Sequence, residues 1–136
     1  SLSTHYDDIK IPNESKTSLR PDFSALIYPV ISMDNAITHK GSKHSLIGEQ
    51  PAQDIELYYS LEKQVNKQTP VTFLVHAKDD KAVPLENSLR YKEALDKNGI
   101  ANQIEIYETG GHGFGLINKT DPKRWSNDLF KWLEKH

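Results

Sequence analysis

Two short segments of this chain carry the side chains best suited to proton transfer. Residues 76–84 (HAKDDKAVP) contain two adjacent carboxylates, Asp79 and Asp80, and residues 110–114 (GGHGF) place His112 between glycines. A carboxylate can fix the tautomer of a histidine and stabilise its charge, while the histidine takes the proton of a nucleophile. We therefore expect His112 to act as a general base, with one of the two aspartates as its partner.

Apolar runs before these segments predict the strands that would position them. Residues 71–75 (VTFLV) form the clearest strand, and residues 103–107 (QIEIY) alternate polar and apolar side chains, which is typical of an edge strand. Ligands of open parallel sheets bind at the carboxyl ends of the strands, where both segments lie. Because neighbouring strands are ~4.8 Å apart, the carboxylate and the imidazole can come within hydrogen-bonding reach.

The rest of the chain predicts the elements around these two strands. Residues 25–30 (ALIYPV) are apolar without alternation, which favours a strand that is buried on both faces and ends at Pro29. Residues 32–49 are polar, and we expect them to form a loop. The expected helices are residues 51–60, residues 86–98 closed by Gly99, and a last helix that begins at Asp121 and Pro122.

The last helix has a distinct apolar face. Trp125, Leu129, Trp132 and Leu133 recur at helical spacing, so we expect both tryptophans in the core and not on a sugar-stacking surface. Strands and helices alternate along the whole chain, which predicts right-handed crossovers. The expected fold class is therefore α/β: three parallel strands with flanking helices, in three layers.

Composition narrows the possible functions. The 136 residues suit a single domain, in which residues 1–22 form the end of a helix and a loop and residues 23–136 carry the strand–helix repeats. The chain has 19 acidic and 17 basic residues, and its net charge is −2. Because the two kinds of residue interleave along the sequence, we expect no nucleic-acid partner. No apolar stretch approaches the ~20 residues of a membrane span, and no targeting segment is recognisable, which leaves the compartment open.

Metal and cofactor chemistry find little support in the sequence. The chain has no cysteine, so disulfides and thiolate metal sites are excluded. A metal held by His76, Asp80 and His112 is conceivable, but their spacing matches no strong ligand motif. We expect His76 to be packed inside the protein, and we expect no metal and no cofactor.

Several motifs together resemble a known family. Residues 76–84 are similar to the acid loop of the α/β-hydrolase superfamily, His-Gly-x-x-Asp-x-x-Val-Pro, with Ala77 in place of glycine. That register implies Asp80 as the acid and leaves Asp79 to bond loop amides. Further segments resemble the acetylxylan-esterase-like branch; they are residues 20–23 (RPDF), 28–33 (YPVISM), 83–88 (VPLENS) and 110–116 (GGHGFGL).

The resemblance implies a serine esterase that hydrolyses carboxylic esters, with acetyl groups on xylan or related carbohydrates as a possible substrate class. Such an enzyme needs a serine on a Gly-x-Ser-x-Gly turn, and this sequence contains none; Ser24, Ser32 and Ser88 lack the flanking glycines. We therefore expect a fragment of the hydrolase fold that begins after the serine, carries Asp80 and His112, and is inactive alone. A peptidase or lactonase of the same fold, and a non-catalytic binding or assembly module, remain alternatives.

The resemblance also implies a partner. In this family the strand at Ala25 to Val30 would lie beside the strand that carries the nucleophile, so its edge is open without that neighbour. We expect two copies of the chain to pair there about a two-fold axis. The other expected partner is a small-molecule or carbohydrate ester, bound by the full-length parent.

Overall fold

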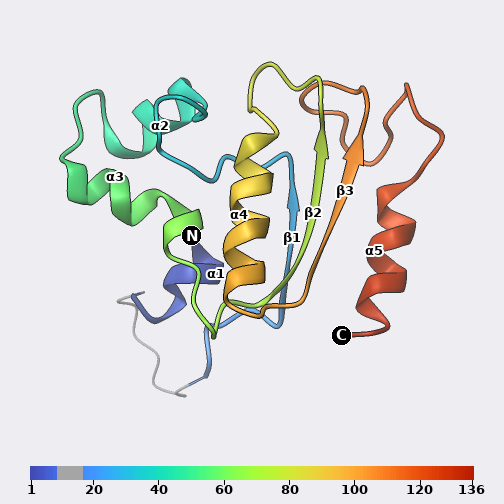
Figure 1. Ribbon diagram of the computed structural model, residues 1–136, viewed down its shortest axis with the longest axis horizontal. Helices are drawn as coiled ribbons and strands as arrows, with labels where there is room; N and C mark the ends of the chain where they lie inside the picture. The colour runs from blue at the N-terminus through green and yellow to red at the C-terminus, as the bar shows by residue number, and fades with distance from the viewer. Residues whose placement is uncertain (9–16) are drawn as a thin grey trace.

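The computed structural model describes residues 1–8 and 17–136 of the chain. These residues form a parallel sheet with helices on both of its faces (Figure 1). The strands are β1 (Phe23–Ile27), β2 (Val71–Ala77) and β3 (Asn102–Tyr107). The helical segments are α1 (Leu2–His5), η1 (Tyr6–Asp8), α2 (Lys40–Ile47), α3 (Gln53–Tyr59), η2 (Leu61–Lys63), α4 (Glu86–Lys97) and α5 (Trp125–Leu133).

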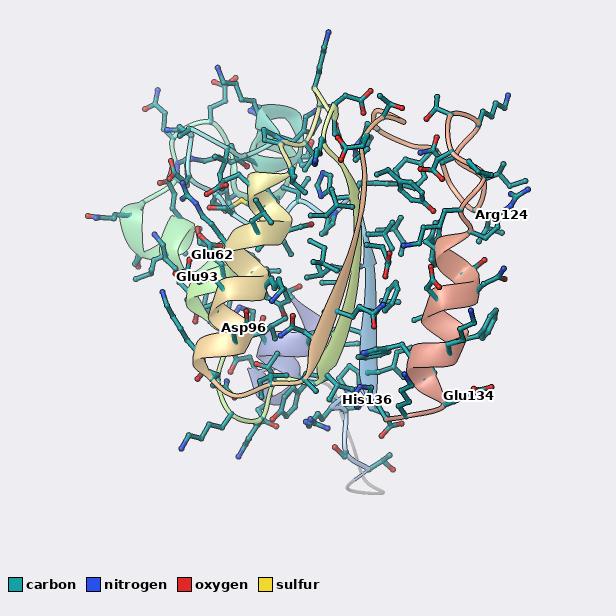
Figure 2. All side chains as sticks on the ribbon, turned by 45° about the vertical axis from the view of Figure 1, so that its right-hand side comes forward. Glu62, Glu93, Asp96, Arg124, Glu134 and His136 are labelled. Carbon is teal, nitrogen blue, oxygen red and sulfur yellow. The ribbon has the colours of Figure 1, made fainter. Side chains whose placement is uncertain are left out.

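The sheet has the strand order β1-β2-β3, and both pairs are parallel. Leu74 in the central strand stands beside Leu26 of β1 and Ile104 of β3, which fixes the register. Figure 2 shows the sheet between α4 on one side and α5 on the other. The predicted α/β fold with three layers is confirmed, and β3 is an edge strand as its alternation indicated.

The two faces of β2 belong to two separate cores, because successive side chains of a strand point to opposite faces. Phe73, Val75 and Ala77 face α5 and pack with Tyr107 and the two tryptophans of that helix. Both tryptophans are buried, as predicted from their spacing, and the ring of Trp132 lies 5.7 Å from that of Phe73.

The core on the other face lies between β2 and α4. Leu74 packs there with Ile31, Tyr91 and Leu95. Helix α4 ends in a Schellman motif, in which the N–H of Ile100 donates to the carbonyl of Leu95. Gly99 supplies the left-handed residue that this motif needs, with φ of 70°, so the glycine closes the helix as predicted.

One helix is missing from the sequence prediction. Residues 32–49 were expected to form a loop, but residues 40–47 form α2. Apolar periodicity is weak in this segment, and the buried ammonium group of Lys43 joins the helix to neighbouring segments. That group donates to the carbonyl of Met33 at 2.9 Å and the side chain of Asn35 at 2.8 Å, and it also binds Glu56 on α3.

The start of the last helix was also predicted wrongly. Helix α5 begins at Trp125 and not at Asp121. The hydroxyl of Tyr107 donates to the carbonyl of Lys123 at 2.9 Å and accepts from the N–H of Trp125 at 3.0 Å, which holds the segment before the helix against β3. A long-range contact of this kind has no local sequence signal.

The remaining boundaries shift by a few residues. Strand β1 starts earlier than predicted and ends at Ile27, strand β2 extends to Ala77, and α3 begins at Gln53, so Pro51 precedes its cap. Residues 9–16 of the predicted N-terminal helix end and loop lie outside the described residues. In the described part of the chain, no helix is long and apolar enough to cross a bilayer.

Candidate active site

The loops after β2 and β3 bring one carboxylate to the histidine. Oδ2 of Asp80 lies 2.7 Å from Nδ1 of His112. Asp79 instead accepts a hydrogen bond from the N–H of Gly111 at 2.8 Å. The two strands run side by side up to Ala77 and Tyr107, so the loops leave the sheet at the same edge. The structure thus separates the roles of the two aspartates, and only Asp80 contacts the imidazole.

Asp80 is buried, and the acid loop fixes its orientation. Its side chain has no exposed surface, and Oδ1 accepts the N–H groups of Ala82 and Val83, each at 2.9 Å. Burial alone would raise the pKa of Asp80, but the hydrogen bonds from Val83, His112 and Ala82 outweigh it and hold the pKa below its ordinary value. The carboxylate is therefore charged, with Oδ2 directed at His112.

His112 has one nitrogen committed and one available. Because the carboxylate can only accept, Nδ1 carries the proton of the 2.7 Å bond, and Nε2 of the neutral ring keeps its lone pair. Nε2 has no hydrogen-bond partner among the residues that the structure describes. The side chain is 39% exposed, so that nitrogen can be reached from solution. This is the arrangement of a general base held by an acid.

The backbone before His112 follows a path that requires glycine. Gly110 has φ of 147° and Gly111 has φ of 62°. A Cβ on Gly110 would lie 2.6 Å from the side chain of Asn118. Asn118 in turn donates to the carbonyl of Thr109 at 2.7 Å, which fastens the loop to the end of β3. The glycines thus allow the tight turn that presents His112.

Tyr28 also belongs to the site, and the sequence prediction missed this role. Its ring packs edge-on against His112, with centroids 4.7 Å apart, and against Phe114 at 5.1 Å. Tyr28 has φ of 40°, the only positive value at a described residue other than glycine, and its N–H donates to the carbonyl of Val75 at 2.7 Å. The one local signal is its position before Pro29 at the end of a strand.

His76 lies inside β2 and is fully buried, as expected. Its Nε2 lies 2.8 Å from the carbonyl of Val83, and Nδ1 lies 2.8 Å from Oγ of Ser88. A carbonyl only accepts, so Nε2 carries the proton and Nδ1 accepts from the serine. Burial lowers the pKa of His76, which keeps the ring neutral. In the described residues no group of three or more histidine and carboxylate side chains is arranged to hold a metal.

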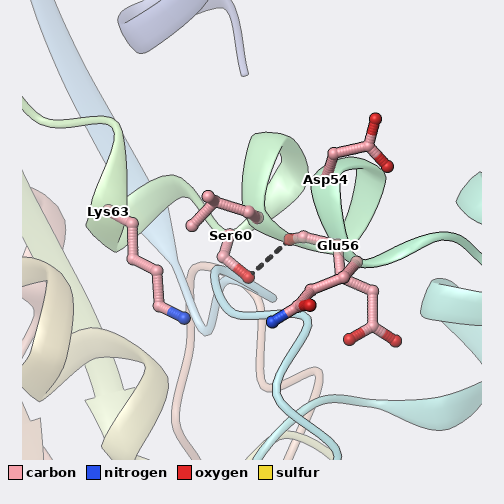
Figure 3. A pocket seen from close by; sticks show the side chains of 6 residues that line it. Asp54, Glu56, Ser60 and Lys63 are labelled. Carbon is pink, nitrogen blue, oxygen red and sulfur yellow. Dashed lines mark hydrogen bonds between the residues drawn. The ribbon is translucent and has the colours of Figure 1, made fainter.

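Among the hollows of the described structure, one lies beside α3 and another lies against the glycine loop (residues 110–114). A cavity of about 390 Å³ opens beside α3, where Oγ of Ser60 donates to the carbonyl of Glu56 (Figure 3). Neither Asp80 nor His112 lines it. A second hollow of about 240 Å³ lies against the glycine loop, with Phe114 and Ile117 in its wall. The second hollow is lined in part by Gly113, which follows the candidate base His112. The first hollow is lined by residues of the segment between β1 and β2.

Sheet, layers and site together define a class of protein. A parallel sheet covered on both faces, with an aspartate and then a histidine after its last two strands, is the carboxyl-terminal arrangement of an α/β-hydrolase. Residues 22–136 match the prolyl oligopeptidase family, and the chain belongs to that family.

Two of its relatives have names that refer to xylan. An acetylxylan esterase from Xylanibacter ruminicola is 38% identical over 110 residues, which are 78% of this chain and 23% of the relative. An endo-1,4-beta-xylanase B from Butyrivibrio fibrisolvens is 37% identical over 128 residues, 93% of this chain and 20% of that protein.

Solved structures agree with this grouping. The acetyl ester-xyloside bifunctional hydrolase from Caldicellulosiruptor lactoaceticus superposes with a TM-score of 0.90 at 39% identity, over 98% of this chain and 50% of that one. A sugar hydrolase from Lactococcus lactis superposes with a TM-score of 0.69 at 30% identity, over 88% of this chain and 50% of the other. The chain therefore spans half the length of these structures and about a quarter or less of the two curated relatives.

Proposed function

We propose that Asp80 and His112 are the acid and base of a serine esterase that removes acetyl groups from xylan or related carbohydrates. The observation that carries this proposal is the 2.7 Å bond from a buried carboxylate to Nδ1 of a half-exposed histidine whose Nε2 is available. The acetylxylan esterase and the acetyl ester-xyloside hydrolase among the relatives support the substrate class.

In the proposed reaction, Nε2 of His112 takes the proton of a serine hydroxyl as the serine oxygen attacks the ester carbonyl. Asp80 stabilises the imidazolium that results. The same proton then passes to the departing sugar oxygen, which leaves an acetyl-serine. A water molecule, deprotonated by His112, hydrolyses this intermediate and releases acetate, and His112 returns the proton to the serine.

The serine of this proposal lies outside the 136 residues. No Gly-x-Ser-x-Gly segment occurs in the sequence, and no described serine hydrogen-bonds to His112. We expect the gene to encode such a segment upstream, and the 136-residue chain to hydrolyse esters no faster than background. Peptide and lactone cleavage use the same groups, but the named activities of the relatives favour esters.

The proposal is tested with the chain extended upstream to include a Gly-x-Ser-x-Gly segment. We expect turnover of 4-nitrophenyl acetate and of acetylated xylo-oligosaccharides, with a loss in kcat of roughly 10⁴-fold for Asp80→Asn and roughly 10⁶-fold for His112→Ala. Asp79→Asn is the matched control, since its amide oxygen can still accept from Gly111, and its kcat should stay within about tenfold of the parent.

Two outcomes would contradict the proposal. Turnover that survives His112→Ala would mean that the base lies elsewhere. Absence of turnover in an extended chain with an intact serine turn would favour a non-catalytic binding or assembly module. Cleavage of peptides or lactones in place of acetyl esters would keep the acid and base and change the substrate.

A further inference from the structure

We infer that His76 is a positioning residue, which orients the Asp80 carboxylate for its hydrogen bond to His112; the inference rests on the proposed function. The observation is a continuous buried chain of contacts from Ser88 on α4 through His76 to Asp80 and then to His112. Nε2 of His76 lies 3.4 Å from the same Oδ2 of Asp80 that bonds the base.

Val83 is held through both its backbone N–H and its backbone carbonyl. Its N–H donates to Oδ1 of Asp80 at 2.9 Å, and its carbonyl accepts from Nε2 of His76 at 2.8 Å. Rotation of the carboxylate breaks its bond to the N–H of Val83, and His76 holds Val83 in place through the carbonyl. His76 therefore restrains the acid through the loop as well as by direct contact.

Ser88 orients the ring of His76. Its Nδ1 accepts from the hydroxyl of Ser88, which lies in the first turn of α4. Both residues have no exposed surface, so water cannot replace either hydrogen bond. The ring is thus hydrogen-bonded to helix α4 on one side and to the acid loop on the other. Through these bonds α4 helps to position Asp80.

Ser88, His76 and Asp80 also have the residue types of a second triad, but their burial excludes that role. All three residues are buried, and Ser88 and His76 have no exposed surface, so a substrate cannot reach the oxygen of Ser88. The N–H of the His76 ring donates to the carbonyl of Val83. The group can hold a structure in place and cannot deliver a nucleophile.

The test reads the tautomer of His112 in the 136-residue chain, and so needs no enzymatic activity. The ¹⁵N shifts of the ring report which nitrogen carries the proton, and we expect a single Nδ1–H tautomer with a low-field proton resonance in the parent. In His76→Phe we expect that resonance to broaden and the Nε2–H tautomer to appear. His76→Gln should restore the parent spectrum, because its amide N–H can reach Val83.

Two serine variants keep the test informative if His76→Phe does not fold. Ser88→Ala removes the hydrogen bond that orients His76 and should give an intermediate spectrum. Ser32→Ala is the matched control, because Ser32 is equally buried but its hydroxyl bonds Glu62, away from the site. An unchanged His112 spectrum in Ser88→Ala and His76→Phe would overturn the inference, as would an equal change in Ser32→Ala.

The extended chain separates this inference from the proposed function. There His76→Phe should lower kcat at least about tenfold, with KM unchanged, and less than the roughly 10⁴-fold loss in Asp80→Asn. Full kcat in His76→Phe would overturn the inference and leave the esterase proposal intact. The opposite result is also possible: the extended chain has no esterase activity, but the tautomer of His112 still changes in His76→Phe. That result would overturn the esterase proposal and leave the inference that His76 positions Asp80 against His112.

Discussion

Two imidazoles face one carboxylate oxygen at this site, and their exposure to solvent gives them different tasks. His76 has no exposed surface, whereas the side chain of His112 is 39% exposed. The buried ring has both nitrogens bonded within the protein, and the exposed ring keeps one nitrogen for a reacting group. Burial, and not residue type, therefore decides which histidine can serve as a base.

Burial of His76 gives a prediction for the stability of the chain. Because burial lowers the pKa of His76 in the folded state, the unfolded state, with its ordinary pKa of about 6.5, binds the proton first as the pH falls. The contribution of neutral His76 to the free energy of unfolding is thus present above pH 6.5 and lost below it, by at most about 1.4 kcal/mol per pH unit.

Urea unfolding between pH 7.5 and pH 5 measures this loss. His76→Gln cannot titrate in this range, so its free energy of unfolding should fall less steeply with pH than that of the parent. The difference between the two variants at pH 7.5 gives the cost of the substitution itself and is subtracted. Parallel pH profiles for parent and variant would contradict the prediction.

At the scale of elements, helix α4 shows how packing divides residues that look alike in the sequence. The sequence of α4 offers three apolar side chains for packing: Leu89, Ala94 and Leu95. Leu95 is fully buried in the core beside Leu74, whereas Leu89 is 38% exposed. Tyr91, which the sequence prediction left out, fills the place beside Leu95. A helix of 12 residues can direct only part of its surface at the sheet, and the crossing of the two elements selects which part.

This difference predicts unequal costs for one substitution. Leu95→Ala leaves a cavity in the core and should lower the free energy of unfolding by about 2–5 kcal/mol. Leu89→Ala changes the same side chain on the same helix at the surface, and should cost about 0.5 kcal/mol or less. Urea unfolding followed by circular dichroism compares them. Equal losses in both variants would mean that α4 packs differently from the structure.

At the scale of the whole molecule, β1 is one of the two edge strands of the described sheet, and β3 is the other. Strand β1 pairs only with β2 among the described strands, and Phe23 and Ala25 on it are exposed. An open strand edge offers unpaired backbone groups to another strand. We propose that two copies of the 136-residue chain pair along this edge about a two-fold axis.

Sedimentation over a range of concentrations tests the pairing. We expect a dimer for the parent chain and a monomer for Ala25→Lys, because a buried charge at the strand edge opposes pairing. Gln103→Lys on β3, at the other edge of the sheet, is the matched control and should remain dimeric. A monodisperse monomer for the parent at all concentrations would contradict the proposal. Loss of the dimer in Gln103→Lys would mean that the two copies pair along β3 and not along β1.

The sequence by itself determined the order of strands and helices around the site and the residues that could act there. Periodicity and glycine positions report local preferences of the backbone, so β2, α4 and the core role of both tryptophans could be predicted. The acid loop and the glycine loop could also be placed at the carboxyl ends of neighbouring strands. The catalytic roles of Asp80 and His112 stay a prediction.

Only the tertiary structure decided which side chains meet. The 2.7 Å bond of Asp80 to His112 and the packing of Tyr28 against His112 join residues that are far apart along the chain. Helix α2 likewise depends on the contact of Lys43 with α3. Such contacts depend on distances and burial in the folded chain, which no local pattern of residues encodes.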